Sequence, residues 1–107
     1  MVLTPEQVAA IPPVPMGTIA GVTHRVLWNS GGSMAGVMRV DADHHLGLHQ
    51  HRANDHHMWM LDGHATILGS QLGPGSYVHI PSGVEHDIDA STTDGCTLLY
   101  LYLSPTG

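Results

Sequence analysis

The chain has 107 residues, 42% of them hydrophobic, and a formal net charge of −6 when its ten histidines are neutral. A length of this order suits one domain with a single modest core. Only Arg25, Arg39 and Arg52 are basic, so no basic patch is available to neutralise nucleic-acid phosphates or an anionic membrane surface. The charge balance therefore argues against nucleic acid and membrane as partners.

The sequence has no mark of export or of membrane insertion. No basic stretch is followed by an apolar run, and no apolar stretch reaches the length of about 18 residues that a membrane span needs. Cys96 is the only cysteine, so an internal disulfide is impossible and a reducing compartment is compatible. We expect a soluble, cytoplasmic protein in which Cys96 is a small apolar side chain of a late strand.

Residues 1–16 predict an N-terminal arm in front of a folded domain of residues 17–107. Thr4, Pro5 and Gln7 have the form of a helix start, with an N-cap, a proline at the first helical position and a capping-box partner. Three prolines between residues 12 and 15 then end the helix after about two turns. An arm of this kind can lie over the sheet edge of a partner chain.

The domain itself alternates short apolar runs with turn residues such as Gly, Pro, Asn and Asp. No long segment has the 3.6-residue period of a helix. Many short strands separated by turns predict an all-β sandwich or barrel. The expected strands cover residues 23–30, 33–40, 45–51, 56–63, 64–69, 76–81, 85–90 and 96–103.

Six of the ten histidines fall between residues 45 and 64. Residues two apart in a strand share a face, so His49 and His51 would project side by side and suit two adjacent positions on one metal ion. Such a pair is a weak signal, because roughly one is expected by chance in so histidine-rich a chain. A later stretch, GSYVHIPSGVEH, adds His86 after a bend at Pro81 and Gly83, which aims it into the same space.

These pieces resemble the two motifs of the cupin superfamily, G(x)5HxH(x)3–4E(x)6G and G(x)5PxG(x)2H(x)3N. The matching positions are His49, His51 and Gly63 in the first motif and Gly75, Pro81, Gly83 and His86 in the second. Two departures are Gly47, separated from His49 by one residue rather than five, and Ala90 in place of the last asparagine. The resemblance covers roughly residues 22–103 and implies a cupin double-stranded β-helix, or jelly-roll barrel, with a short N-terminal arm. It also implies a homodimer, because cupins commonly pair by their edge strands.

The most informative departure lies at the glutamate of the first motif, where this chain has His56. The resemblance implies one divalent transition metal ion (Fe, Mn, Zn, Ni or Cu) held by His49, His51, His56 and His86. Two alternatives stay open: a three-histidine site without His56, or Asp55 in its place. Four neutral imidazoles would leave the ion its full charge, whereas a carboxylate would cancel one unit. The four-histidine site should therefore attract anionic oxygen ligands more strongly.

Strand alternation extends the predicted site into a pocket. If His56 points inward, so do Met58 and Met60, while His57 and Trp59 face the other way. Tyr77 and His79 share one face of their strand, which is either the pocket or the outside. The residues that we expect to line a substrate pocket are Met38, Met58, Met60, Tyr77, His79 and Tyr100. We expect His44, His45, His57 and His64 at the surface or at the pocket rim.

Small cupins with all-histidine sites resemble dioxygenases that cleave carbon–carbon bonds, and this chain is similar to the subgroup that includes dihydroxyacetophenone dioxygenase and the zinc domains of anti-sigma factors. The resemblance implies a metal-dependent dioxygenase that acts on a small carbonyl or enolisable substrate. No lysine is present to form a Schiff base or to act as a general base. The alternatives are a cyclase, isomerase or lyase that uses the metal as a Lewis acid, and a non-catalytic metal or small-ligand binding module.

Overall fold

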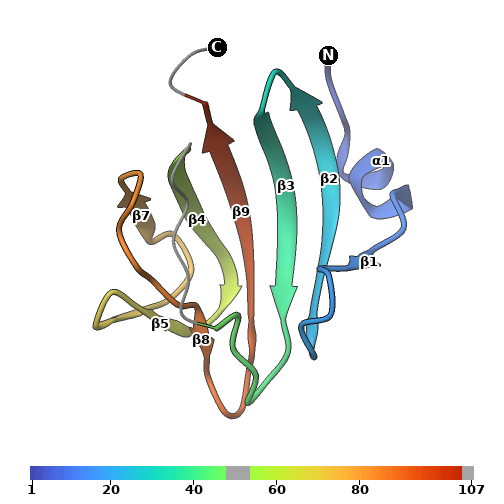
Figure 1. The fold of residues 1–107 in the computed structure, drawn as a ribbon. Coiled ribbons are helices and arrows are strands. Elements are labelled where there is room, and N and C mark those ends of the chain that lie inside the picture. Colours follow the sequence, from blue (N-terminus) through green and yellow to red (C-terminus); the bar gives the residue numbers. More distant parts are fainter. Residues whose placement is uncertain (48–53, 105–107) are drawn as a thin grey trace.

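Two antiparallel β-sheets that face each other make up the fold (Figure 1). The computed structural model describes residues 1–47 and 54–104. The larger sheet has the strand order β1-β2-β3-β9-β4-β7, and the smaller one has the order β6-β5-β8. The strands are β1 (Val14–Pro15), β2 (Val22–Ser30), β3 (Ser33–Val40), β4 (Asp55–Gly63), β5 (Ala65–Ile67), β6 (Ser70–Leu72), β7 (Tyr77–Ile80), β8 (Asp89–Ala90) and β9 (Cys96–Leu103). The prediction of an all-β jelly roll is confirmed.

Most of the predicted strands agree with the observed ones. The predicted strand at 85–90 is shorter than expected, because only Asp89–Ala90 forms a strand there. The short β1 and β6 were not expected, because strands of two or three residues are too short to show an alternating pattern. The predicted strand at 45–51 runs into residues 48–53, which lie outside the described residues. Its first residue, His45, forms a single bridge with Asp89.

The N-terminal arm begins with the predicted helix, α1 (Pro5–Ala10). The Thr4 hydroxyl accepts a hydrogen bond from the Gln7 N–H, and the Gln7 side chain accepts one from the Thr4 N–H, so the capping box is present. Beyond the helix, the Arg25 Nε donates to the Ile11 carbonyl at 2.7 Å, and β1 pairs with β2. The arm is therefore attached to the sheet of its own chain, beside β2 (Figure 1). In the described residues no helix is long and apolar enough to cross a membrane.

The core lies between the two sheets and comes from strict alternation along the longer strands. In β9 the residues at even positions are buried and those at odd positions are partly exposed, and β3 and β4 show the same rule over most of their length. Cys96 is fully buried among these residues, as expected, and burial raises the pKa of its thiol to about 11. The largest fully buried apolar side chains are Tyr100, Met38, Met58, Ile67, Ile80, Ile88 and Leu98.

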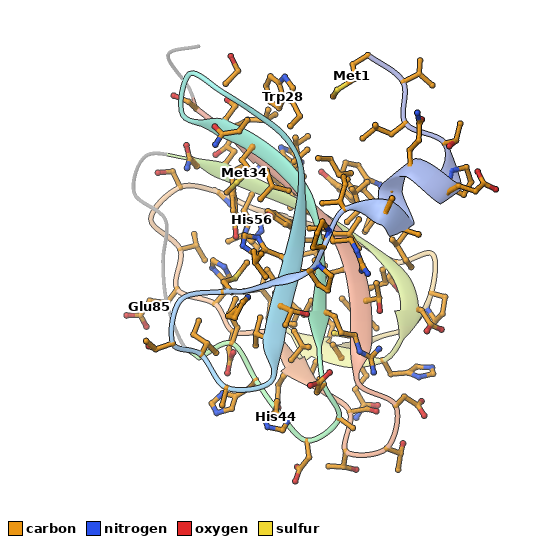
Figure 2. All side chains as sticks on the ribbon, turned by 90° about the vertical axis from the view of Figure 1, so that its right-hand side faces the viewer. Met1, Trp28, Met34, His44, His56 and Glu85 are labelled. Carbon is orange, nitrogen blue, oxygen red and sulfur yellow. The ribbon has the colours of Figure 1, made fainter. Side chains whose placement is uncertain are left out.

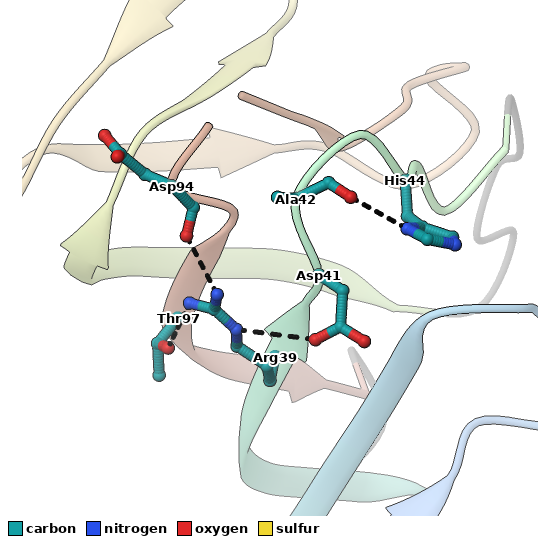
Figure 3. Close-up of polar contacts among 6 residues, drawn as sticks. All are labelled: Arg39, Asp41, Ala42, His44, Asp94 and Thr97. Atoms are coloured by element: carbon teal, nitrogen blue, oxygen red, sulfur yellow. Dashed lines mark hydrogen bonds and ion pairs between the residues drawn. The ribbon is translucent and has the colours of Figure 1, made fainter. Parts of the chain in front are cut away.

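Arg39 links the C-terminal end of β3 to the start of β9 (Figure 3). Its guanidinium donates to the Asp94 carbonyl at 2.8 Å and to the Thr97 hydroxyl at 3.3 Å, and its Nε lies 3.7 Å from an Asp41 carboxylate oxygen. At the same end, Gly63 has φ +73°, and a Cβ there would collide with the Gly95 carbonyl oxygen. The close packing of this end holds β3, β9 and β4 in the register that places their inward-facing residues side by side.

Candidate metal centre

Two of the four predicted metal ligands lie together inside the barrel. His56 comes from β4, and His86 follows the bend after β7, yet both side chains are buried. Figure 2 shows His56 inside the molecule, with Glu85 and His44 at its surface. The His56 Nδ1 and His86 Nε2 atoms are 3.3 Å apart. Neighbouring nitrogen ligands that each lie about 2.0–2.1 Å from one ion are about 3.0–3.4 Å apart, so this pair has the separation that a shared metal ion requires.

The orientation of His86 also suits a ligand. Its Nδ1 lies 3.1 Å from the Val84 carbonyl oxygen. Because a carbonyl only accepts, Nδ1 carries the hydrogen of the neutral ring and Nε2 carries the lone pair. Histidine ligands are commonly oriented in this way, with the second ring nitrogen bonded to a carbonyl. The His56 N–H that now faces the His86 lone pair would have to give up its proton for both rings to bind one ion.

His49 and His51, the other two predicted ligands, lie outside the described residues. The chain just before them is anchored beside His86. The Gly47 N–H donates to an Asp87 carboxylate oxygen at 2.8 Å, and the other Asp87 oxygen lies 2.9 Å from His45 Nδ1. The Leu46 N–H also donates to the Ile88 carbonyl at 3.0 Å. Asp87, which was not predicted from the sequence, therefore positions the segment that precedes the paired histidines.

The charge of Asp87 strengthens this anchor. Burial by itself would raise the pKa of the Asp87 carboxyl, but the hydrogen bonds from His45 and from the Gly47 N–H outweigh it and hold the pKa below its usual value. The hydrogen bond to Asp87, and then its charge, raise the pKa of His45. A carboxylate directly after a predicted histidine ligand is the sequence signal that would have identified Asp87.

The inward direction of His56 agrees with strand alternation. Met58 and Met60 are 1% and 2% exposed on the same face of β4, whereas Trp59 is 37% exposed on the other. Asp55, the alternative ligand, also lies on the outer face, where its carboxylate accepts a hydrogen bond from the Ser82 N–H. The strand therefore brings His56 to His86 and carries Asp55 away from it.

Four rings, from His24, Tyr100, Tyr102 and His56, form a row across the barrel. His24 Nδ1 lies 2.7 Å from the Tyr100 hydroxyl. The ring of Tyr100 lies 5.0 Å from that of Tyr102, and Tyr102 lies 4.3 Å from His56, measured between centroids. Burial raises the pKa of both tyrosines, so their phenols stay protonated at ordinary pH. The row therefore ends at the histidine pair and contains a buried phenol that is hydrogen bonded to an imidazole.

Gly36 makes room for this row. It pairs directly opposite Tyr100, on β3. A Cβ at Gly36 would collide with the hydroxyl and the ring of Tyr100. A residue without a side chain is thus required for Tyr100 to lie flat across β3 and reach His24. Met38, also expected in the pocket, is fully buried on the same face of β3.

Tyr77 and His79, which we expected to line the pocket, lie instead on the outer face of the large sheet. The Tyr77 side chain is 49% exposed and that of His79 is 42% exposed. The pairing of β7 with β4 explains this correction, because His79 is opposite His57 and Tyr77 is opposite Trp59. Ile80 takes the inward face of β7 and is 1% exposed. The outer face therefore carries a group of rings of its own, separate from the inner row.

A three-residue cluster on this outer face could also hold a metal ion. Asp55, His57 and His79 each offer one ligand atom, and these atoms all lie within 4.8 Å of one another. The sequence alone did not indicate this cluster, because only the pairing of β4 with β7 brings His79 beside residues more than twenty positions away. Of the other histidines, His44, His45 and His64 are exposed, as expected.

A family model described as the ChrR cupin-like domain matches residues 5–104. No curated protein sequence matches the chain. Among solved structures, a predicted oxalate decarboxylase from Thermotoga maritima superposes with a TM-score of 0.82 and 18% identity, over 97% of this chain and 99% of that one. The polyketide cyclase RemF from Streptomyces resistomycificus gives a TM-score of 0.79 and 18% identity, over 97% of this chain and 82% of that one.

The Rhodobacter sphaeroides complex of SigE with the anti-sigma ChrR contains a further similar chain. The TM-score is 0.76 and the identity is 19%, over 89% of this chain and 50% of that one. The present chain thus spans about half the length of its counterpart. At such low identity these superpositions support the fold alone.

Proposed function

The chain belongs to the ChrR cupin-like family, and from this premise we propose that it is a metal-dependent enzyme, a dioxygenase that acts on a small carbonyl or enolisable compound. The observation that carries the proposal is the meeting of His56 and His86 inside the barrel, with 3.3 Å between Nδ1 of one and Nε2 of the other. Two buried imidazoles at this separation, in a wall of apolar side chains, suit one mononuclear metal ion.

The full ligand set in this proposal is His49, His51, His56 and His86. The first two lie outside the described residues, and the anchoring of Gly47 by Asp87 supports their approach to His86. The ion is a divalent transition metal such as Fe, Mn, Zn, Ni or Cu. When bound, it would supply Lewis-acid chemistry, and redox chemistry if it is iron, manganese or copper, to a substrate oxygen.

The residues around the pair have distinct tasks in this proposal. Met38, Met58 and Met60 exclude water and bind the apolar part of the substrate. Tyr100 keeps its proton because burial raises its pKa, and its hydroxyl is hydrogen bonded to His24. A proton can pass along this bond, so the Tyr100–His24 couple can hold and return the proton that moves when a ketone is converted into its enol.

A second candidate is a cyclase, isomerase or lyase that uses the ion as a Lewis acid only. The names of two structural neighbours, a polyketide cyclase and a predicted oxalate decarboxylase, favour this class. A non-catalytic metal or small-ligand binding module is the third candidate. The similar chain in the SigE–ChrR complex favours it, although the present chain spans only half of that protein.

One experiment separates the three candidates. Protein purified without added metal is analysed for its metal content, and oxygen uptake is then followed with small diketones, phenolic ketones and thiols. If the protein is a dioxygenase, oxygen uptake should require the bound metal and should match the loss of substrate. Substrate conversion without oxygen uptake would favour the Lewis-acid enzyme. A metal-loaded protein that converts none of these compounds would favour the binding module.

The proposal includes a homodimer. It is supported by apolar side chains that are exposed in the N-terminal arm, which include Met1, Val2 and Val14. Burial of these side chains against a second copy would remove apolar surface from water. Light scattering coupled to size-exclusion chromatography gives the mass in solution, and a monomer at all concentrations would exclude the dimer.

A further inference from the structure

Asp55, His57 and His79 lie together on the outer face of the large sheet, separated from the interior pair by the sheet itself. His57 and His79 are directly opposite each other on β4 and β7, and their rings stack with 4.6 Å between centroids and an angle of 10°. The Asp55 carboxylate lies 3.8 Å from His79 Nε2. Two imidazoles and one carboxylate therefore converge on one side of two neighbouring strands.

The neighbours of the cluster hold two of its members in place. The Tyr77 hydroxyl lies 2.5 Å from His57 Nδ1. When this Nδ1 donates to the phenol oxygen, Nε2 keeps the lone pair that a metal ion needs. One Asp55 oxygen accepts a hydrogen bond from the Ser82 N–H, which leaves the other oxygen, the one near His79, to act as a ligand. His57 and Asp55 thus each have one atom bonded to the protein and one atom available to a metal ion.

We propose that Asp55, His57 and His79 form a second metal site, which binds a borderline divalent cation such as Zn²⁺, Cu²⁺, Ni²⁺ or Co²⁺. Imidazole and carboxylate ligands suit these ions, whereas Mg²⁺ and Ca²⁺ prefer oxygen ligands alone. In a tetrahedral site the donor atoms would lie about 3.4 Å apart, so they must move inward by about 1 Å or less. Since Asp55 and His79 are 51% and 42% exposed, small side-chain rotations can achieve this.

This site does not depend on the function proposed for the interior. His56 and His57 are consecutive residues, but alternation along β4 sends one to each face of the sheet. Three protein ligands leave at least one position of the outer ion open to solvent. We therefore expect weaker binding at the outer site than at a fully enclosed one, and free exchange of the ion with the solution.

The test is a titration of the metal-depleted 107-residue chain with Zn²⁺. Binding is measured by isothermal titration calorimetry and by NMR of the histidine ring nitrogens. We expect the outer site to appear as a zinc-binding event that shifts the ring signals of His57 and His79. Its affinity should fall at least tenfold in His79→Ala, in His57→Ala and in Asp55→Asn. Tyr77→Phe should weaken it by a smaller factor, because it removes the hydrogen bond that orients His57.

His64→Ala is the matched control. His64 is also exposed and lies 2.9 Å from a carboxylate, that of Asp94, but the described residues offer it no third ligand of this kind. This variant should keep the outer zinc. The proposal is overturned if His79→Ala binds zinc as the wild type does, or if His64→Ala loses as much zinc as His79→Ala. A single zinc that only the outer variants remove would support this site while contradicting the interior one.

Discussion

His56 and His57 are adjacent on β4 and belong to opposite sides of the protein. The ring of His56 lies 4.3 Å from that of Tyr102 inside the barrel, and the ring of His57 lies 4.6 Å from that of His79 outside it. Both histidines have a histidine neighbour from the second half of the chain, His86 for His56 and His79 for His57. The two side chains can therefore be compared in matched variants of the same fold.

The first prediction concerns the interior metal. His56→Ala should lower the affinity for this metal by roughly 10- to 100-fold or more, at least the loss seen when a residue that only orients a metal ligand is removed. It should also lower the melting temperature, since a bound metal stabilises the folded state. Metal content after dialysis and thermal unfolding with and without chelator measure both effects. His57→Ala alters only the outer face and should keep the interior metal. If His57→Ala loses the interior metal and His56→Ala keeps it, the inward-facing residue of β4 has been misassigned.

The second prediction concerns the histidine at the position where a glutamate is usual. His56→Glu should retain the metal, because a carboxylate is also a good ligand, but it should cancel one unit of the ion's charge. Anionic ligands should then bind more weakly. Titration with azide, followed by the absorption of a Co²⁺- or Cu²⁺-loaded sample, measures this change. An azide affinity equal to that of the wild type would argue that residue 56 is not a ligand.

The third prediction uses two glycines with the same backbone conformation. Gly63 has φ +73° and Gly69 has φ +78°, but a Cβ at Gly63 would collide with the Gly95 carbonyl oxygen, whereas one at Gly69 meets nothing within 4 Å. Gly69→Ala should cost about 1 kcal/mol of folding free energy, from the left-handed backbone alone. Gly63→Ala should cost about 3 kcal/mol or more, because a backbone neighbour cannot move aside. Urea unfolding measures both, and equal costs would contradict the predicted collision.

The fourth prediction concerns Cys96. Burial raises the pKa of its thiol from 9.0 to about 11, so the folded protein holds almost no thiolate at pH 8. A disulfide reagent such as DTNB should react very slowly with the native protein and rapidly after unfolding. The unfolded thiol ionises first as the pH rises, so this group should lower the folding stability between about pH 9 and pH 11. Fast reaction of the native protein at pH 8 would show that the thiol is accessible.

Local patterns were enough to predict much of this protein. The capping box predicted α1, and turn residues between short apolar runs predicted most of the strands. The two motifs predicted the jelly roll and indicated His56 and His86 as interior residues, which the structure buries side by side. These features depend on residues close together in the chain, where a period of two residues decides which side chains share a face.

The tertiary structure decided what the local pattern left open. In β7 both faces carry bulky side chains, Tyr77 and His79 on one and Val78 and Ile80 on the other, so alternation alone could not indicate which face is inward. The register with β4 decided it, by placing His79 opposite His57. The same pairing assembled the Asp55–His57–His79 cluster, and the contact of Asp87 with Gly47 positioned the chain before His49. Such relationships join residues far apart in sequence, and they exist only after the strands have paired.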